Sequence, residues 1–266
     1  MRKLLVVAIA VAGVILSLPM QVRAQGGTPR ISAADAKRPV PRLHDGTVDL
    51  TGPWVDGGSN DDIERDGGLK PGELPLLPWA RALRDKRLKQ DEPYTACLPM
   101  GVPRHNPYPW KIVNGYTAKG LTHIYILHET GDAGAHRQVL MNGKHPAPDD
   151  LYPSWFGHSI GRFEKDTLVI DTVGYNDRFW FDARGTPHTE QLHTIERFTR
   201  ITFGTMINDF TLDDPGAFSR PVQLKFTATH IRPDLELMEF ICLEDNQYGI
   251  AGGFVPANEG GQRGNK

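Results

Sequence analysis

The second half of the chain is a succession of short runs in which apolar and polar residues alternate. In residues 222–230 every second side chain, from Val222 to His230, is apolar or aromatic, and Gln, Lys and Thr stand between them. Alternation with a period of two places one face of a strand against a core and the other face in water. Runs rich in β-branched and aromatic residues and bounded by turn signals predict further strands in residues 121–129, 136–146, 161–172, 193–203, 207–214 and 235–242, and residues 49–54 are the first segment that looks ordered.

Helical periodicity is scarce by comparison. Residues 78–90 predict the one clear helix, because a proline begins a run of Ala and Leu set among basic residues. Many consecutive strands joined by short turns favour an antiparallel sheet that closes into a barrel or folds into a sandwich. We expect a mainly all-β fold, an antiparallel β-barrel with one short N-terminal helix and long loops.

The first residues have the pattern of a secretory signal. Two cations precede an apolar run over residues 4–18, and Val22-Arg23-Ala24 supplies the small residues of a cleavage site. A membrane anchor is the alternative, but the apolar run is shorter than the roughly 20 residues that span a bilayer. The predicted organisation is a signal peptide (1–24), a flexible arm (25–42), one barrel domain (43–250) and a flexible Gly-rich tail (251–266), in a periplasmic or secreted protein.

Two cysteines, Cys97 and Cys242, are present. In an oxidising compartment such a count predicts one disulfide, and two buried free thiols are the alternative. The bond would close a loop of about 145 residues and stabilise the fold on the order of 5 kcal/mol.

Charge and motifs exclude several function classes. The formal net charge is −2 and the pI is about 6.5, which disfavours nucleic acid and anionic membranes as partners. The sequence has no P-loop, no Rossmann glycine pattern and no G-x-S-x-G elbow. We therefore expect no cofactor, no membrane insertion after signal cleavage, and a small molecule as the substrate or ligand.

Several motifs together resemble a large family of exported bacterial proteins: DLTGPW, CLPMGVPR, GHSIGRFEKDTLVIDTVGYNDRFWFD, GTPHTEQLHTIERF and DDPGAFSRP. The resemblance runs from Asp49 to about Asn246 and implies export and a β-rich domain. Gly52-Pro53-Trp54 is also similar to the first strand of lipocalins and other calycins, which implies a closed barrel with the tryptophan packed across one end.

The segment from Tyr175 to Arg197 concentrates polar and aromatic chemistry. It follows a predicted strand end, so we expect Tyr175, Asn176, Phe179 and Trp180 to form the lid and one wall of a pocket at the barrel mouth, where they bind substrate. Asn176 and Asp177 also suit a simple turn, since their side chains bond their own backbone.

Acid–base chemistry is the reaction class that these residues suit best, because a histidine changes its charge near neutral pH. The catalytic candidates are His188, His193 and His158, with Asp177, Asp182, Glu190 and Glu196 as partners. A structural role is the alternative for each histidine. Glu190 and His193 also have the spacing of a carboxylate metal site on a helix, but the sequence shows no second pair, and no metal is expected.

Four further residues are candidates for substrate binding. Trp155 precedes His158, and His230 extends the apolar face that begins at Val222. Arg104 suits a clamp on a substrate carboxylate, or it closes a loop on the sheet. Glu239 points into the barrel in one interpretation and pairs with Arg197 in the other.

The resulting functional expectation is an exported enzyme, a lyase, isomerase or hydrolase, acting on a small hydrophobic or aromatic substrate such as a phenolic, terpenoid or glycoside. A lipocalin-like protein that binds a small molecule without catalysis is the first alternative. A structural protein of the cell envelope is the second.

Overall fold

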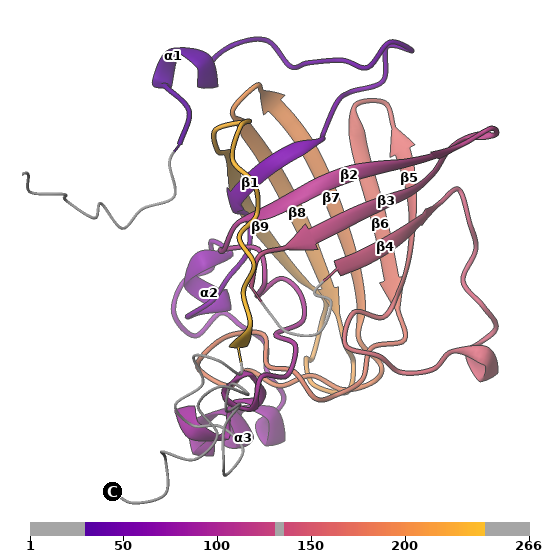
Figure 1. Ribbon diagram of the computed structural model, residues 1–266. Helices are drawn as coiled ribbons and strands as arrows, with labels where there is room; N and C mark the ends of the chain where they lie inside the picture. Colours follow the sequence, from indigo (N-terminus) through magenta and orange to yellow (C-terminus); the bar gives the residue numbers. More distant parts are fainter. Residues whose placement is uncertain (1–29, 131–135, 243–266) are drawn as a thin grey trace, which may run out of the picture.

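The computed structural model describes residues 30–130 and 136–242 of the chain. Within these residues nine strands form a closed barrel, and the few helices are short (Figure 1). The expected β-barrel is therefore confirmed. The expected signal peptide and the Gly-rich tail lie outside the described residues.

The elements follow one another with long connections in the first half of the chain and mostly short ones in the second. In chain order they are α1 (Ala33–Ala36), β1 (Gly52–Asp56), α2 (Ile63–Asp66), α3 (Pro78–Lys86), η1 (Lys89–Asp91), η2 (Pro93–Ala96), β2 (Trp110–Thr117), β3 (Gly120–His128), β4 (His136–Met141), η3 (Pro148–Asp150), β5 (His158–Glu164), β6 (Thr167–Val173), β7 (His193–Thr202), β8 (Thr205–Asp213) and β9 (Val222–His230).

Neighbouring strands pair antiparallel around the barrel, and β9 pairs with β1 to close it. The exception is the parallel pair β4–β5, whose register runs only from Val139 opposite Ser159 to Met141 opposite Gly161. A left-handed turn at Asn142 (φ 55°) ends β4, so this strand is shorter than the one predicted over residues 136–146. It opens a crossover over residues 142–157 that passes outside the barrel (Figure 1).

Two apolar clusters fill the interior. The first is built around Trp54 and Trp110, whose ring centroids are 6.3 Å apart, and it includes Phe198 and Met206. All four side chains are fully buried. Trp54 thus lies in the barrel interior, and the buried side chains of this cluster occupy space that an apolar ligand would need.

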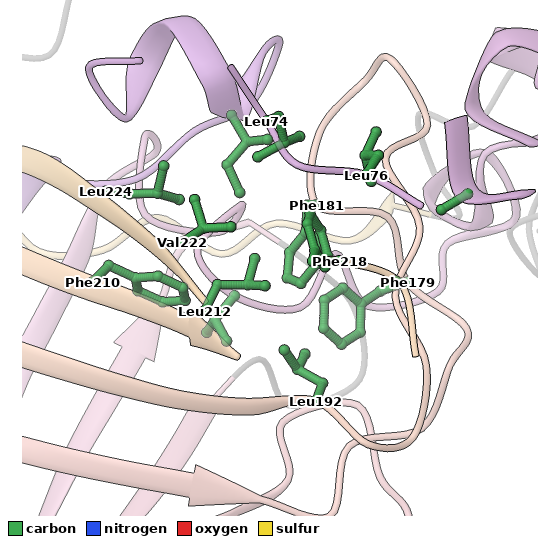
Figure 2. Close-up of a cluster of buried hydrophobic side chains, with 14 of the residues drawn as sticks. Leu74, Leu76, Phe179, Phe181, Leu192, Phe210, Leu212, Phe218, Val222 and Leu224 are labelled. Atoms are coloured by element: carbon green, nitrogen blue, oxygen red, sulfur yellow. The ribbon is translucent and has the colours of Figure 1, made fainter. Parts of the chain in front are cut away.

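The second cluster lies at the end of the barrel that α2 and α3 cover, and it contains the aromatic residues expected in a lid. Phe179 and Phe181 are 1% and 0% exposed, and Figure 2 shows them among Leu192, Phe218 and neighbouring apolar side chains. Trp180 is also buried, under the Arg87 guanidinium at 4.6 Å from its ring centroid. The expectation of a lid is corrected: these rings are core, because the loop folds inward and closes the barrel end.

Two strand expectations differ from the structure. Strand β2 is not among the predicted strands, and it has a register irregularity between Gly115 and Tyr116. Residues 235–242 form no strand. The pairing of β9 with β1 leaves no free sheet edge for them. Glu239 is consequently exposed, and Arg197 pairs with Glu164 at 2.8 Å rather than with Glu239.

The expected disulfide is present between Cys97 and Cys242, with a Cα–Cα distance of 5.6 Å. It ties residues that follow the barrel's last strand to the loop that follows η2. The helix predicted over residues 78–90 is α3, which ends at Lys86.

Candidate active site

A slot of about 360 Å³ opens in the barrel wall where β4 and β5 begin. Pairing between these strands starts only at Val139 and Ser159, and the slot lies beside the start of this register. The first residues of β4 and β5 form no ladder with each other, so the two strands are not held together at this point. The lining includes His123, His136, Arg137, Phe156, His158 and Ser159.

A chain of hydrogen bonds leads from the slot across the outer face of the barrel. Nδ1 of His158 lies 2.8 Å from Nδ1 of His145, and Nε2 of His145 lies 3.1 Å from Oδ1 of Asp171. The same carboxylate oxygen lies 2.8 Å from Nε2 of His193. Three imidazoles and one carboxylate are thus linked, with His158 at the end that reaches the slot.

Strand register explains why these side chains meet. His158, Asp171 and His193 alternate with the buried residues of β5, β6 and β7, so all three point away from the core. Asp171 is opposite Ile195, which makes His193 its diagonal neighbour on the outer face. His145 arrives from the crossover, just after the turn at Asn142.

The hydrogen bonds fix the tautomers when the histidines are neutral. An ionised carboxylate only accepts, so Nε2 of His145 donates to Asp171 and leaves Nδ1 of His145 as an acceptor. Nδ1 of His158 must then donate, which leaves Nε2 of His158 with its lone pair. Partial burial and the nearby His145 lower the pKa of His158, so the neutral form with a basic Nε2 prevails at neutral pH.

Sequence reasoning named His158 and His193 and missed both residues that connect them. Asp171 and His145 both lie in segments predicted only as strands, over residues 161–172 and 136–146. The sequence did contain a signal for Asp171. It lies two residues before the end of its strand, and if that strand pairs antiparallel with the strand that begins at His193, both side chains point to the same face of the sheet. No pattern in the sequence placed His145, which depends on the course of the crossover.

His188, the other expected catalytic histidine, lies in the core and away from this chain. Its ring is 3% exposed and sits 3.9 Å from the ring of Phe179. Burial lowers its pKa to about 4, and its Nδ1 lies 3.2 Å from the carbonyl of Thr189. Of its expected partners, Asp182 is buried and accepts the backbone N–H groups of Ile63 and Thr186, which is a structural role.

Glu196 points to the interior and forms a buried ion pair with Arg137. The Nη2–Oε2 distance is 2.6 Å, and the two side chains are 1% and 0% exposed. Nδ2 of Asn208 donates to the other oxygen of Glu196 at 3.4 Å. Because Arg137 also lines the slot, this pair connects the barrel interior with the slot wall.

The remaining expected residues are dispersed. Asp177 and Glu190 are exposed, and neither joins the chain of histidines. Arg104 is buried and pairs with Glu92 at 2.6 Å, which favours the loop-closing interpretation over a clamp. The other positions lie in packed surroundings: Tyr175 and Asn176 are buried, Trp155 packs against the second apolar cluster, and His230 makes an edge contact with Trp54 at 4.8 Å.

Two further features concern metal binding and membrane-spanning helices. In residues 30–130 and 136–242 no group of three or more His, Cys, Asp or Glu side chains is arranged to hold a metal ion. In the same ranges no helix has the length and apolar character to cross a bilayer.

Comparison of the chain with protein-family models, with characterised proteins and with solved structures gave no match. The resemblances to an exported bacterial family and to calycins therefore stay expectations.

Proposed function

We propose that the protein is an enzyme that moves protons with its own side chains, acting on a small organic molecule in the slot between β4 and β5. The observation that carries this proposal is the position of His145, which bridges Asp171 and His158 while His158 lines the slot. A carboxylate that orients an imidazole, which in turn orients a base, is an arrangement that suits general acid–base catalysis.

His158 is the group that exchanges the proton in this proposal. Its Nε2 takes a proton from the substrate, and the positive charge is stabilised through His145 by Asp171. In an isomerisation the same proton returns to another substrate atom. In an elimination it leaves with the departing group, so both reactions are balanced without a further reactant. The slot also offers Phe156 and Leu140 for apolar contact with a ring.

Carriage of an apolar ligand inside the barrel has less support, because the Trp54 cluster fills that volume. Export into an oxidising compartment is part of the proposal and is supported by the Cys97–Cys242 disulfide.

A measurement without substrate tests the proton arrangement. Long-range ¹H–¹⁵N NMR distinguishes the two nitrogens of each imidazole, and we expect His158 to carry its proton on Nδ1 at pH 7. Asp171→Asn should abolish this preference, because an amide does not fix the tautomer of His145 as a carboxylate does. A proton on Nε2 of His158 in the unaltered protein would refute the arrangement.

Turnover is tested by incubating the protein with phenolic, terpenoid and glycoside compounds and analysing products by mass spectrometry. For any compound converted, His158→Gln should lower kcat by about 10²-fold or more, the usual contribution of a positioned acid or base. Asp171→Asn should cause a smaller loss. Arg162→Gln is the matched control, since Arg162 is an exposed residue of the same strand that lies outside the slot lining. An unchanged kcat in His158→Gln would exclude this residue as the base.

A further inference from the structure

The inner end of the slot carries polar groups that the proposed proton transfer does not use. Arg137 lines the slot, and its Nη2 is engaged by Glu196 and, at 3.4 Å, by the hydroxyl of Thr172. Its Nε and Nη1 are buried and have no hydrogen-bond partner among the described residues. A buried donor without a partner destabilises the fold, and more so when it is charged. An acceptor atom of a ligand that reached this depth would therefore gain a hydrogen bond from this guanidinium.

Two buried histidines lie in the same region. The ring of His105 is 4.9 Å from that of His128, and Arg137 is close enough to lower the pKa of both. Burial is the larger cause of these shifts and brings the pKa of His105 to about 4. Both rings are thus uncharged at neutral pH. Neither nitrogen of His128 has a partner in the described part of the chain.

The wall beside these groups is flat and aromatic. Phe156 lines the slot, and its ring is nearly parallel to that of His128, with an angle of 5° and a centroid distance of 6.5 Å. The ring of His105 lies 5.2 Å from Phe156. A planar group would find ring faces and edges on this side, which favours an aromatic or conjugated ligand.

Charge balance decides which oxygen such a ligand presents. The charge of Arg137 is already compensated by Glu196, and the two histidines are neutral. A carboxylate would add an unpaired negative charge to a buried site, which is unfavourable. A carbonyl oxygen is uncharged and accepts from one of the two unpartnered Arg137 donors without adding a charge.

We propose that the slot binds a conjugated carbonyl compound, such as an aryl ketone, with its carbonyl oxygen on Arg137 and its ring against Phe156. This inference deepens the proposed function and rests on it for the identity of the site. If His158 removes a proton beside the carbonyl, the negative charge moves to the carbonyl oxygen, and the electrons of the broken C–H bond form the enolate. Arg137 then stabilises that oxygen more in the transition state than in the substrate.

The test compares three ligands of similar shape by isothermal titration calorimetry: acetophenone, benzoate and ethylbenzene. We expect acetophenone to bind about tenfold or more tightly than ethylbenzene, which corresponds to one net hydrogen bond. It should also bind more tightly than benzoate. Equal affinity for acetophenone and ethylbenzene would overturn the inference, and so would a preference for benzoate.

Variants assign the preference to Arg137. Removing Arg137 alone leaves Glu196 buried and unpaired, so the double variant Arg137→Met/Glu196→Met is used, because apolar replacement of a buried pair is often close to neutral for stability. The double variant should bind acetophenone and ethylbenzene equally, while Arg162→Gln keeps the preference. A preference retained in the double variant would overturn the inference.

The two proposals fail in different experiments. Loss of kcat in His158→Gln, together with no preference for acetophenone, would leave proton transfer standing and overturn the carbonyl site. A clear preference for acetophenone, together with an unchanged kcat in His158→Gln, would leave the carbonyl site standing and overturn proton transfer by His158.

Discussion

Replacing His188 with phenylalanine tests whether a buried histidine makes this fold sensitive to acid. The imidazole of His188 packs on Phe179, and its Nε2 has no partner within the described residues. Its pKa is lowered to about 4, chiefly by burial. In the unfolded chain a histidine titrates near 6.5, so the unfolded state takes up the proton first as the pH falls.

The sign and the size of the effect follow from this difference. The pKa of His188 is lower in the folded than in the unfolded protein. The unfolding free energy that depends on neutral His188 is therefore fully present above pH 6.5 and is lost as the pH falls towards 4. A gap of about 2.5 pH units at about 1.4 kcal/mol per unit amounts to about 3 kcal/mol of unfolding free energy. Phenylalanine takes up no proton. His188→Phe should therefore lose about 3 kcal/mol less than the unaltered protein between pH 7 and pH 4.

The measurement is urea unfolding followed by tryptophan fluorescence at several pH values from 7 to 4. The comparison concerns the pH dependence, so a constant change in packing energy cancels. Other buried histidines such as His105 contribute equally to both proteins and cancel as well. His44→Phe is the control, because His44 is exposed and the substitution should leave the pH dependence unchanged. Equal pH dependence for His188→Phe and the unaltered protein would refute the reasoning.

The buried ion pair and the disulfide give the remaining stability predictions. Glu196→Gln should lower the unfolding free energy by about 3–5 kcal/mol, because it leaves the Arg137 charge buried without its partner. The Arg137→Met/Glu196→Met variant should lose less than Glu196→Gln; a larger loss in urea unfolding would contradict this. Replacing Cys97 and Cys242 with alanine opens a loop of 145 residues and should cost on the order of 5 kcal/mol, read from the shift of the urea midpoint. A midpoint equal to that of the oxidised protein would show that the cross-link does not stabilise the fold.

Strand alternation made most of the barrel predictable. The alternation in residues 222–230 marks a strand with the bounds that β9 has, Val222–His230. The failures have local causes. Strand β2 follows a proline-rich loop and has an irregular register, and the apolar run of residues 235–242 lies beyond the strand that already closes the barrel.

The site was predictable only in part. His158 and His193 were named from their residue type, but their connection runs through Asp171 and His145, which are brought together by diagonal register and by the crossover. His188 was named for the same reason as His158. The two differ in burial, and the neighbours of His188 in the sequence, Pro187 and Thr189, give no sign that its ring lies in the core.

Asp171 accepts from two histidines, and the second of them holds the carboxylate from the solvent side. His193 is 37% exposed, whereas His145 lies between the carboxylate and the slot. The orientation of the base in the slot therefore depends on a carboxylate that is anchored at the outer surface of the barrel, on the far side of His145 from the substrate.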